Sequence, residues 1–164
     1  MDTISIAALI TLKIMCSWEG IQEIPPGSNR HPLIDRMNAN VNVPYGSNYC
    51  ASAVSYALDS AQANFKRRTA VAQGFITKNS HSYKDVLFGR YQPTAGDIII
   101  WKLGETWKGH TGLVVWWHES KGFTIEANTS KKGVANGRGS GIYHKSRSIN
   151  PTDYFRITHF TKVY

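Results

Sequence analysis

Two cysteines and six histidines are the side chains of this chain that could take part in thiol chemistry. Cys50 follows a turn-prone run, residues 44–48, and opens a segment whose small and apolar residues recur at helical spacing. The pattern predicts a thiol in the first turn of a buried helix. Unpaired backbone N–H groups and the positive end of the helix dipole favour a thiolate there, so Cys50 is a candidate nucleophile. A lone cysteine is more commonly a small buried hydrophobe, so position alone does not decide its role.

A cysteine nucleophile needs a base within hydrogen-bond reach and a third group that orients the base. His110 is the best candidate for the base, because it opens an apolar, strand-like run directly after a flexible Trp-Lys-Gly segment. Its ring can therefore lie at the end of a sheet and face a helix terminus. The other five histidines fall in a turn or in polar, loop-like stretches: His31, His81, His118, His144 and His159.

Two residues of the next predicted strand, Glu126 and Asn128, could orient His110. They are two positions apart, so the alternation of a strand predicts that they share one face. If residues 110–117 and 122–128 form a hairpin, the position opposite His110 falls between 128 and 130. Either side chain could then accept the ring N–H and fix the tautomer of the imidazole.

The elements that must position these residues divide into a helical first part and a strand-rich second part. Helical spacing predicts helices over residues 4–15, 31–37, 50–61 and 82–88, and Pro and Gly predict a loop over residues 20–30. Apolar, β-branched runs predict strands over residues 98–101, 110–117, 122–128, 142–146 and 154–163. This order is typical of an α+β fold, with N-terminal helices on one side of a C-terminal antiparallel sheet of five to six strands that form a meander. No linker is visible, so one domain is expected over residues 1–164.

Composition indicates a globular protein with a basic surface. The 164 residues are 41% hydrophobic, which is enough for one domain with a core. Two cysteines are too few for a disulfide framework, and Cys16, in an apolar helical stretch, is predicted to be structural. The formal charge of +8 predicts attraction to polyanions: nucleic acid, anionic lipid or the anionic polymers of bacterial envelopes.

The apolar N-terminal stretch resembles a secretion signal only superficially. Asp2 stands where a basic region should be, Lys13 interrupts the apolar run, and no small-residue cleavage site follows. The run is also too short for a membrane span. We therefore expect a helix of the domain, synthesis in the cytoplasm without a signal peptide, and no membrane-spanning segment.

Four short motifs strengthen the thiol hypothesis when they are taken in order. They are Gly-Ser-Asn-Tyr-Cys-Ala at residues 46–51, Ala-Gly-Asp-Ile-Ile at 95–99, Gly-His-Thr-Gly-Leu-Val at 109–114 and Ile-Glu-Ala-Asn-Thr at 125–129. Their order and spacing resemble those of the CHAP family, the cysteine, histidine-dependent amidohydrolases/peptidases within the NlpC-type branch of papain-like enzymes. The resemblance covers nearly the whole chain and implies a papain-like fold in a single CHAP-like catalytic domain.

The resemblance also implies a role for each matched residue. Cys50 matches the nucleophile, His110 the general base, Glu126 the orienting acid and Asn128 an additional polar residue beside it. The implied reaction is acyl transfer in two steps on an amide of the peptidoglycan stem peptide or cross-bridge. The Cys50 backbone N–H and a nearby polar group would hold the oxyanion.

A cleft lined with aromatic side chains would suit glycan and peptide, and the expected substrate contacts are Asn48, Tyr49 and Trp107. Trp116 and Trp117 alternate along one strand, so one of them is expected in the core.

No metal and no other cofactor is expected. Some family members bind calcium through aspartates ahead of the cysteine, but residues 40–46 contain no carboxylate. Family members often have tryptophan where this chain has Tyr49 and glycine where it has Ala127. Both departures are compatible with the same chemistry.

The leading hypothesis is a peptidoglycan hydrolase, a phage or bacterial lytic enzyme or an antibacterial effector. It would act at the cell wall or periplasm after release, after injection or as a virion component. Its expected partners are peptidoglycan, anionic wall polymers and an inhibitor or immunity protein, and not nucleic acid. Two alternatives stay open: a papain-like protease or deamidase that acts on a protein, and a non-enzymatic basic domain that binds a polyanion. The second rests on the charge and on basic clusters at residues 66–68 and 131–132, which no nucleic-acid motif accompanies.

Overall fold

A computed structural model describes residues 4–130 and 140–164. The fold is α+β, with the helices early in the chain and most of the strands after them, as the sequence predicts. In chain order the elements are α1 (Ile6–Cys16), α2 (Pro32–Asn40), α3 (Cys50–Ser60), the 3₁₀ helix η1 (Ala72–Phe75), β1 (Ser80–Ser82), α4 (Tyr83–Leu87), β2 (Ile98–Leu103), β3 (Gly109–His118), β4 (Lys121–Thr129), β5 (Gly141–Ser148) and β6 (Phe155–Thr161).

The described strands form one antiparallel sheet in the order β1-β6-β2-β3-β4-β5. Strands β2 to β5 make the predicted meander, in which each strand pairs with the next. The prediction is wrong for β6, which pairs with β2 on its other side. β6 carries fully or almost fully buried residues, such as Ile157 and Phe160, and these suit an inner strand better than an edge. β1 was not predicted, because its Ser-His-Ser sequence has no apolar alternation.

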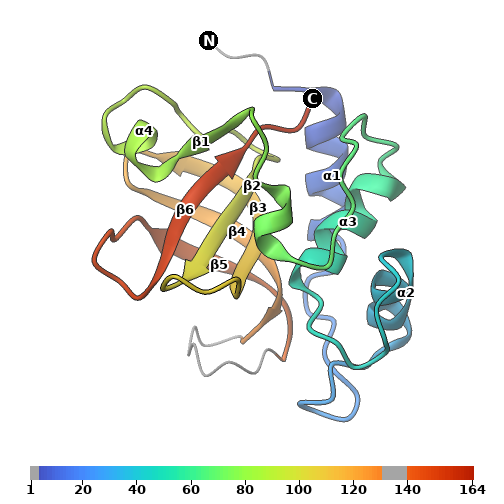
Figure 1. Ribbon diagram of the computed structural model, residues 1–164. Helices are drawn as coiled ribbons and strands as arrows, with labels where there is room; N and C mark the ends of the chain where they lie inside the picture. The colour runs from blue at the N-terminus through green and yellow to red at the C-terminus, as the bar shows by residue number, and fades with distance from the viewer. Residues whose placement is uncertain (1–3, 131–139) are drawn as a thin grey trace.

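The two faces of the sheet bury different hydrophobic clusters. Ile98 and Ile100 of β2 pack with residues of α1, α2 and α3, whereas Ile99 and Trp101 belong to a second cluster on the opposite face. Figure 1 shows α1, α2 and α3 grouped on one side of the sheet and α4 on the other side, next to β1. The prediction that the helices lie on one side is therefore correct for the three N-terminal helices and wrong for α4, whose Val86 packs in the second cluster.

Small side chains let α3 approach the sheet closely. Ala51, Ala53 and Ala57 are all 0% exposed, and the helix contacts both β3 and β4. A close approach of backbone to strand requires residues of this size, because protein interiors are packed to crystal-like density. The small residues after Cys50 therefore determine how near the first residue of α3 comes to the ends of β3 and β4.

The turn before β2 shows why the Gly-Asp motif is needed. Gly96 has φ +88°, and a Cβ there would lie 2.5 Å from the carbonyl oxygen of Ala8 in α1, so glycine alone fits. Asp97 is 1% exposed, and its carboxylate accepts hydrogen bonds from Tyr91 Oη at 2.6 Å and from the Thr94 backbone N–H at 2.7 Å. The motif thus fixes the entry of β2 against α1 and has no part in the thiol site.

The β3–β4 hairpin sets the register on which the site depends. The strands are joined by a two-residue turn, the register shifts between Val114 and Trp116, and the pairing ends with Gly112 opposite Glu126. One of the two tryptophans of β3 is core, as expected, since Trp117 is 6% exposed and its neighbour is mostly exposed.

No helix in the part of the chain that the structure describes is both long and apolar enough to cross a membrane. The predicted N-terminal helix is present as α1, which begins after Ser5, whose Oγ accepts the Ala8 N–H at 3.0 Å.

Candidate active site

Cys50 is the first residue of α3 and is 8% exposed. The turn ahead of it is held by two amide side chains: Asn29 Nδ2 donates to the Gly46 carbonyl at 3.0 Å, and Asn38 Nδ2 donates to the Ser47 carbonyl at 3.2 Å. Within the described residues, the N-cap residue makes no side-chain hydrogen bond to this helix, and its first turn contains no acidic residue. No side-chain cap from the described residues therefore occupies the N–H groups at this end of the helix.

Tyr49 is a correction to the predicted set of substrate contacts. Its side chain is 0% exposed, and its hydroxyl donates to Glu23 Oε1 at 3.0 Å. Burial and the neighbouring charge of Glu23 raise the pKa of Tyr49 far above its usual value. Glu23 is itself 3% exposed and accepts the Asn29 backbone N–H at 3.1 Å. Tyr49 therefore anchors the loop that leads into Cys50, and the prediction that it touches substrate is wrong.

The imidazole of His110 joins Cys50 to Glu126. His110 Nε2 lies 2.9 Å from Glu126 Oε2, and the Cys50 side chain is close enough to the ring to influence its pKa. Because Glu126 occupies Nε2, Nδ1 is the ring nitrogen left for the thiol. Burial alone would lower the pKa of His110, but the hydrogen bonds and charges of Cys50 and Glu126 outweigh it and raise the pKa to about 9.

Glu126, and not Asn128, is the residue that accepts the ring N–H of His110. The carboxylate of Glu126 is 0% exposed. Asn128 has φ +56° at an irregularity of the β4–β5 pairing, and its Nδ2 donates to Asn48 Oδ1 at 3.1 Å instead. The alternation expected for Glu126 and Asn128 is interrupted by this backbone distortion. Of the two alternatives that the sequence left open, the structure places the hydrogen bond on the carboxylate.

Comparison with family models matches residues 39–129 to the CHAP domain. The chain belongs to the CHAP family. The matched segment contains Cys50, His110 and Glu126, and family membership identifies the protein as a cysteine, histidine-dependent hydrolase of the amidohydrolase or peptidase type. No curated protein and no solved structure matches the chain.

Two side chains that complete the surroundings of Glu126 were not predicted. Arg147 of β5 donates from Nε to Glu126 Oε1 at 2.8 Å and from Nη2 to Oε2 at 2.5 Å. Thr124 Oγ1 donates to Glu126 Oε1 at 2.5 Å. Arg147 lies beyond the segment that matches the CHAP model, so no family motif pointed to it. The only sequence signal is its position on β5, an even number of residues from Tyr143, which pairs with Glu126.

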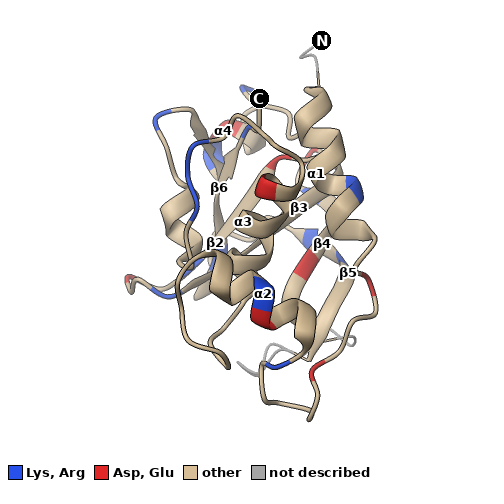
Figure 2. Cartoon of the chain, turned by 90° about the vertical axis from the view of Figure 1, so that its right-hand side faces the viewer, with Lys and Arg blue, Asp and Glu red and all other residues tan. Residues whose placement is uncertain are grey.

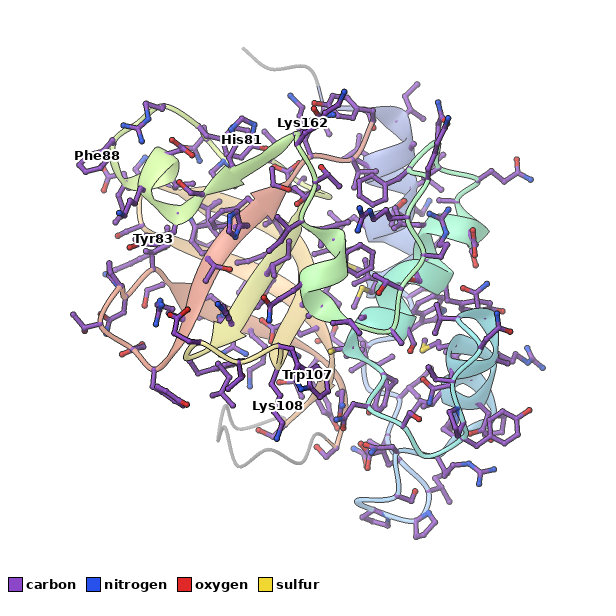
Figure 3. All side chains as sticks on the ribbon, in the orientation of Figure 1. His81, Tyr83, Phe88, Trp107, Lys108 and Lys162 are labelled. Carbon is purple, nitrogen blue, oxygen red and sulfur yellow. The ribbon has the colours of Figure 1, made fainter. Side chains whose placement is uncertain are left out.

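Trp107 lies near the CHAP site on the loop between β2 and β3, three residues before His110. It is 71% exposed, and Figure 3 shows it with Lys108 at the end of the sheet opposite His81 and Phe88. Gln73 Nε2 ties this loop to η1 by donating to the Thr106 carbonyl at 3.1 Å. The tryptophan ring is thus available to a substrate, whereas its loop is fixed by the neighbouring helix.

Cys16 forms a second alignment of thiol, imidazole and carboxylate, outside the CHAP match. Its Sγ lies 3.6 Å from His144 Nε2, and His144 Nδ1 lies 2.7 Å from Glu19 Oε1. His144 lies on β5, within the predicted strand over residues 142–146, and its ring stacks on Phe123. Cys16 ends α1, where the helix dipole disfavours an anion, and burial followed by the charge of Glu19 raises the pKa of its thiol. These features favour a neutral thiol and distinguish it from Cys50.

Basic residues are distributed over the molecule. Figure 2 shows lysine and arginine on several helices and loops rather than in one patch. In the cluster at residues 66–68, Arg68 pairs with Asp59 at 2.5 Å and Arg67 donates to the Gly74 carbonyl at 3.0 Å, so two of its cations hold the local fold. The cluster at residues 131–132 lies outside the described residues. Among the residues that are described, no group of three or more His, Cys, Asp or Glu side chains is arranged to hold a metal ion.

Proposed function

We propose that the protein is a peptidoglycan hydrolase that cleaves an amide bond of the stem peptide or cross-bridge by thiol catalysis. The observation that supports this most directly is the hydrogen bond between His110 and the buried Glu126, with Cys50 close enough to influence the pKa of the ring, inside the segment that matches the CHAP domain. A thiol at a helix N-terminus, a base and a buried orienting carboxylate are the three parts that nucleophilic amide hydrolysis requires.

The first step begins with the proton on His110. The raised pKa of His110 allows the ring to hold the thiol proton at neutral pH, which leaves a thiolate beside an imidazolium. The thiolate of Cys50 attacks the amide carbonyl to form a tetrahedral intermediate. The C–N bond then breaks as His110 gives its proton to the leaving amine, and a thioester on Cys50 remains.

The second step returns the enzyme to its starting state. Water loses a proton to His110 and attacks the thioester carbonyl. The C–S bond breaks, the product leaves as a carboxylic acid, and Cys50 regains its thiolate. Glu126 keeps the same hydrogen bond to the ring in both steps, so the imidazole does not turn as it loses and regains its proton.

The oxyanion of each tetrahedral intermediate needs donors close to Cys50. Its own backbone N–H lies in the open first turn of α3. We assign the second donor to Asn48, whose Oδ1 accepts from Asn128 and whose amide N–H groups are thereby turned toward other partners. In this assignment Asn128 acts on substrate only through Asn48.

Substrate binding is assigned to the exposed ring of Trp107 and to the surface charge. An aromatic face suits the apolar side of a sugar ring, and Trp107 lies on the loop that leads into His110. The charge of +8 suits a wall that carries anionic polymer. We assign the site of action to the cell wall or periplasm on the same grounds.

Digestion of purified peptidoglycan followed by mass spectrometry of the soluble fragments tests this function. New peptide N-termini are expected from cleavage within the stem or cross-bridge, and sugar-free peptides are expected from amidase cleavage. The proposal is overturned if this protein leaves purified walls intact but hydrolyses or deamidates a protein substrate. That result would favour the papain-like protease or deamidase.

A further inference from the structure

Glu126 is a carboxylate that the fold removes completely from water. Burial by itself favours the neutral acid, because a charged group loses its hydration. The environment acts in the opposite direction: burial is outweighed by the hydrogen bonds and charges of Arg147 and His110, and the pKa of Glu126 falls to about 2. The hydrogen bond from Arg147 is the largest of the contributions that lower it.

We propose that Arg147 is a positioning residue of the catalytic site. It keeps Glu126 ionised and fixes its carboxylate so that the same oxygen, Oε2, always faces His110. This inference deepens the proposed function and rests on it for the role of His110. Arg147 acts through Glu126 and is not itself expected to touch the reacting atoms.

The hydrogen bonds around Glu126 leave the carboxylate one orientation. Oε1 accepts from Arg147 Nε at 2.8 Å and from Thr124 Oγ1 at 2.5 Å. Oε2 accepts from Arg147 Nη2 at 2.5 Å and pairs with His110 Nε2 at 2.9 Å. The arginine therefore grips both oxygens in the parallel, forked arrangement that gives these pairs their specificity. Rotation of the carboxylate would break the fork as well as the bond to His110, because Oε2 takes part in both.

A single aromatic ring supports both partners of Glu126. The guanidinium carbon of Arg147 lies 5.2 Å from the centre of the Trp101 ring, and the same ring lies 5.3 Å from the His110 ring. The indole face attracts the cation and limits the positions that its planar group can take. The guanidinium and the imidazole thus contact the same aromatic ring.

Arg147 also forms part of a solvent-accessible cavity. The cavity has a volume of about 180 Å³, and its lining includes Trp101, Arg147, Phe155 and Arg156. Truncation of the Arg147 side chain would therefore open a space that solutes can reach from outside. A guanidinium ion from solution has the shape and charge of the group that would be removed.

Removal of Arg147 should change the pH dependence of the site. The other charged or titratable groups near the carboxylate are His110 on β3 and Lys145 on β5, with Cys50 on α3 behind His110. Lys145 Nζ donates to the Ser130 carbonyl at 2.6 Å, so it does not replace the fork. Without the fork, Glu126 takes up a proton at higher pH and no longer stabilises the charged ring. The acid limb of activity then moves to higher pH.

The test compares Arg147→Ala and Arg147→Lys with a matched control, Arg156→Ala, all on a Cys16→Ser background. Arg156 lines the same cavity but pairs with an exposed carboxylate, that of Glu105. Two assays are run against pH: steady-state kinetics on a peptidoglycan fragment, which give kcat and KM, and the rate of Cys50 alkylation by iodoacetamide. The second needs no substrate, so it reports on the site even if the proposed function fails.

Arg147→Ala should lower kcat at neutral pH by about 10-fold or more, the effect of losing a charge-assisted pair, with little change in KM. The acid limbs of both profiles should move to higher pH by about one unit or more. Arg147→Lys should have a kcat and acid limbs between those of Arg147→Ala and the parent protein. Millimolar guanidinium should restore much of the activity of Arg147→Ala. Arg156→Ala should match the parent protein in both profiles.

Superimposable profiles for Arg147→Ala and the parent would overturn the proposal, as would an equal shift in Arg156→Ala. A shifted alkylation profile in a protein that leaves walls intact would support the role of Arg147 and refute the wall substrate. If Arg147→Ala does not fold, the pKa of His110 is measured by NMR titration in folded Arg147→Lys. A His110 pKa equal to that of the parent protein contradicts the proposal.

Discussion

Replacement of Glu126 by glutamine removes the charge at the centre of the site without changing its shape. Four donors converge on this carboxylate, from His110, from Thr124 and twice from Arg147. A carboxylate accepts all four, but a glutamine offers one acceptor oxygen and one NH₂ group that is itself a donor. In either orientation of the amide, the NH₂ group must face two donors.

The size of the effect follows from the pKa of Glu126. A carboxyl group whose pKa falls from 4.5 to about 2 on folding is stabilised in its charged form. That depression corresponds to about 3 kcal/mol. We therefore expect Glu126→Gln to lose about 3 kcal/mol of unfolding free energy. A loss of similar size in the transition state would lower kcat/KM by about 100-fold.

Asn128→Ala is the matched comparison on the same strand. Its Nδ2 makes one hydrogen bond, to Asn48, and its buried Oδ1 has no hydrogen-bond partner within the described residues. Loss of one neutral hydrogen bond costs about 1 kcal/mol. The smaller change should appear both in urea unfolding and in the rate of turbidity loss of purified walls.

The relative activity losses of Glu126→Gln and Asn128→Ala show which residue orients His110. If folded Asn128→Ala loses more activity than folded Glu126→Gln, the asparagine is the third member of the catalytic group. The carboxylate would then serve only the internal arrangement of the sheet.

Three further predictions follow from the charges and thiols. The charged pair of His110 and Glu126 should stabilise the fold between two limits. The contribution of His110 is complete below pH 6.5 and is lost as the pH rises through about 9. The contribution of Glu126 is complete above pH 4.5 and is lost as the pH falls through about 2. Urea unfolding of the parent and of His110→Ala across this range checks it, and parallel curves would contradict it. Cys16→Ser should leave wall lysis largely unchanged, because the Cys16 thiol favours its neutral form; a loss above about 10-fold in folded protein would contradict that. Lysis should resist EDTA, since residues 40–48 offer only amide, hydroxyl and carbonyl oxygens, and should fall as salt screens the charge of +8 over about 8 Å. EDTA inhibition that calcium reverses, or lysis that salt does not affect, would refute the respective part.

The sequence predicts the parts of the site that depend on local pattern. Helical spacing after a turn places Cys50 at the start of α3, and alternation places His110 and Glu126 on adjacent strands. The two-residue connection sets the register next to the turn, but the pairing shifts by one residue between Val114 and Trp116. This irregularity, which no local pattern predicts, places His110 on the same face as Glu126.

The rest depends on packing that no local pattern reveals. A tyrosine in a turn before a nucleophile suggests a substrate contact, but the Tyr49 hydroxyl donates a hydrogen bond to the buried carboxylate of Glu23. Arg147 resembles any arginine on an edge strand until the register of β5 places it over Trp101 and beside Glu126. The position of β6 likewise depends on which neighbour can bury it, a question that only the assembled sheet answers.

The central claim is that the thiol of Cys50 carries out amide hydrolysis in peptidoglycan. Its most direct test is the release of soluble fragments from purified walls by Cys50→Ala, after circular dichroism and urea unfolding have shown that the variant folds like the parent. We expect no fragment release above the enzyme-free control, with the same result for Cys50→Ser. Release of fragments by folded Cys50→Ala at a rate near that of the parent would contradict it.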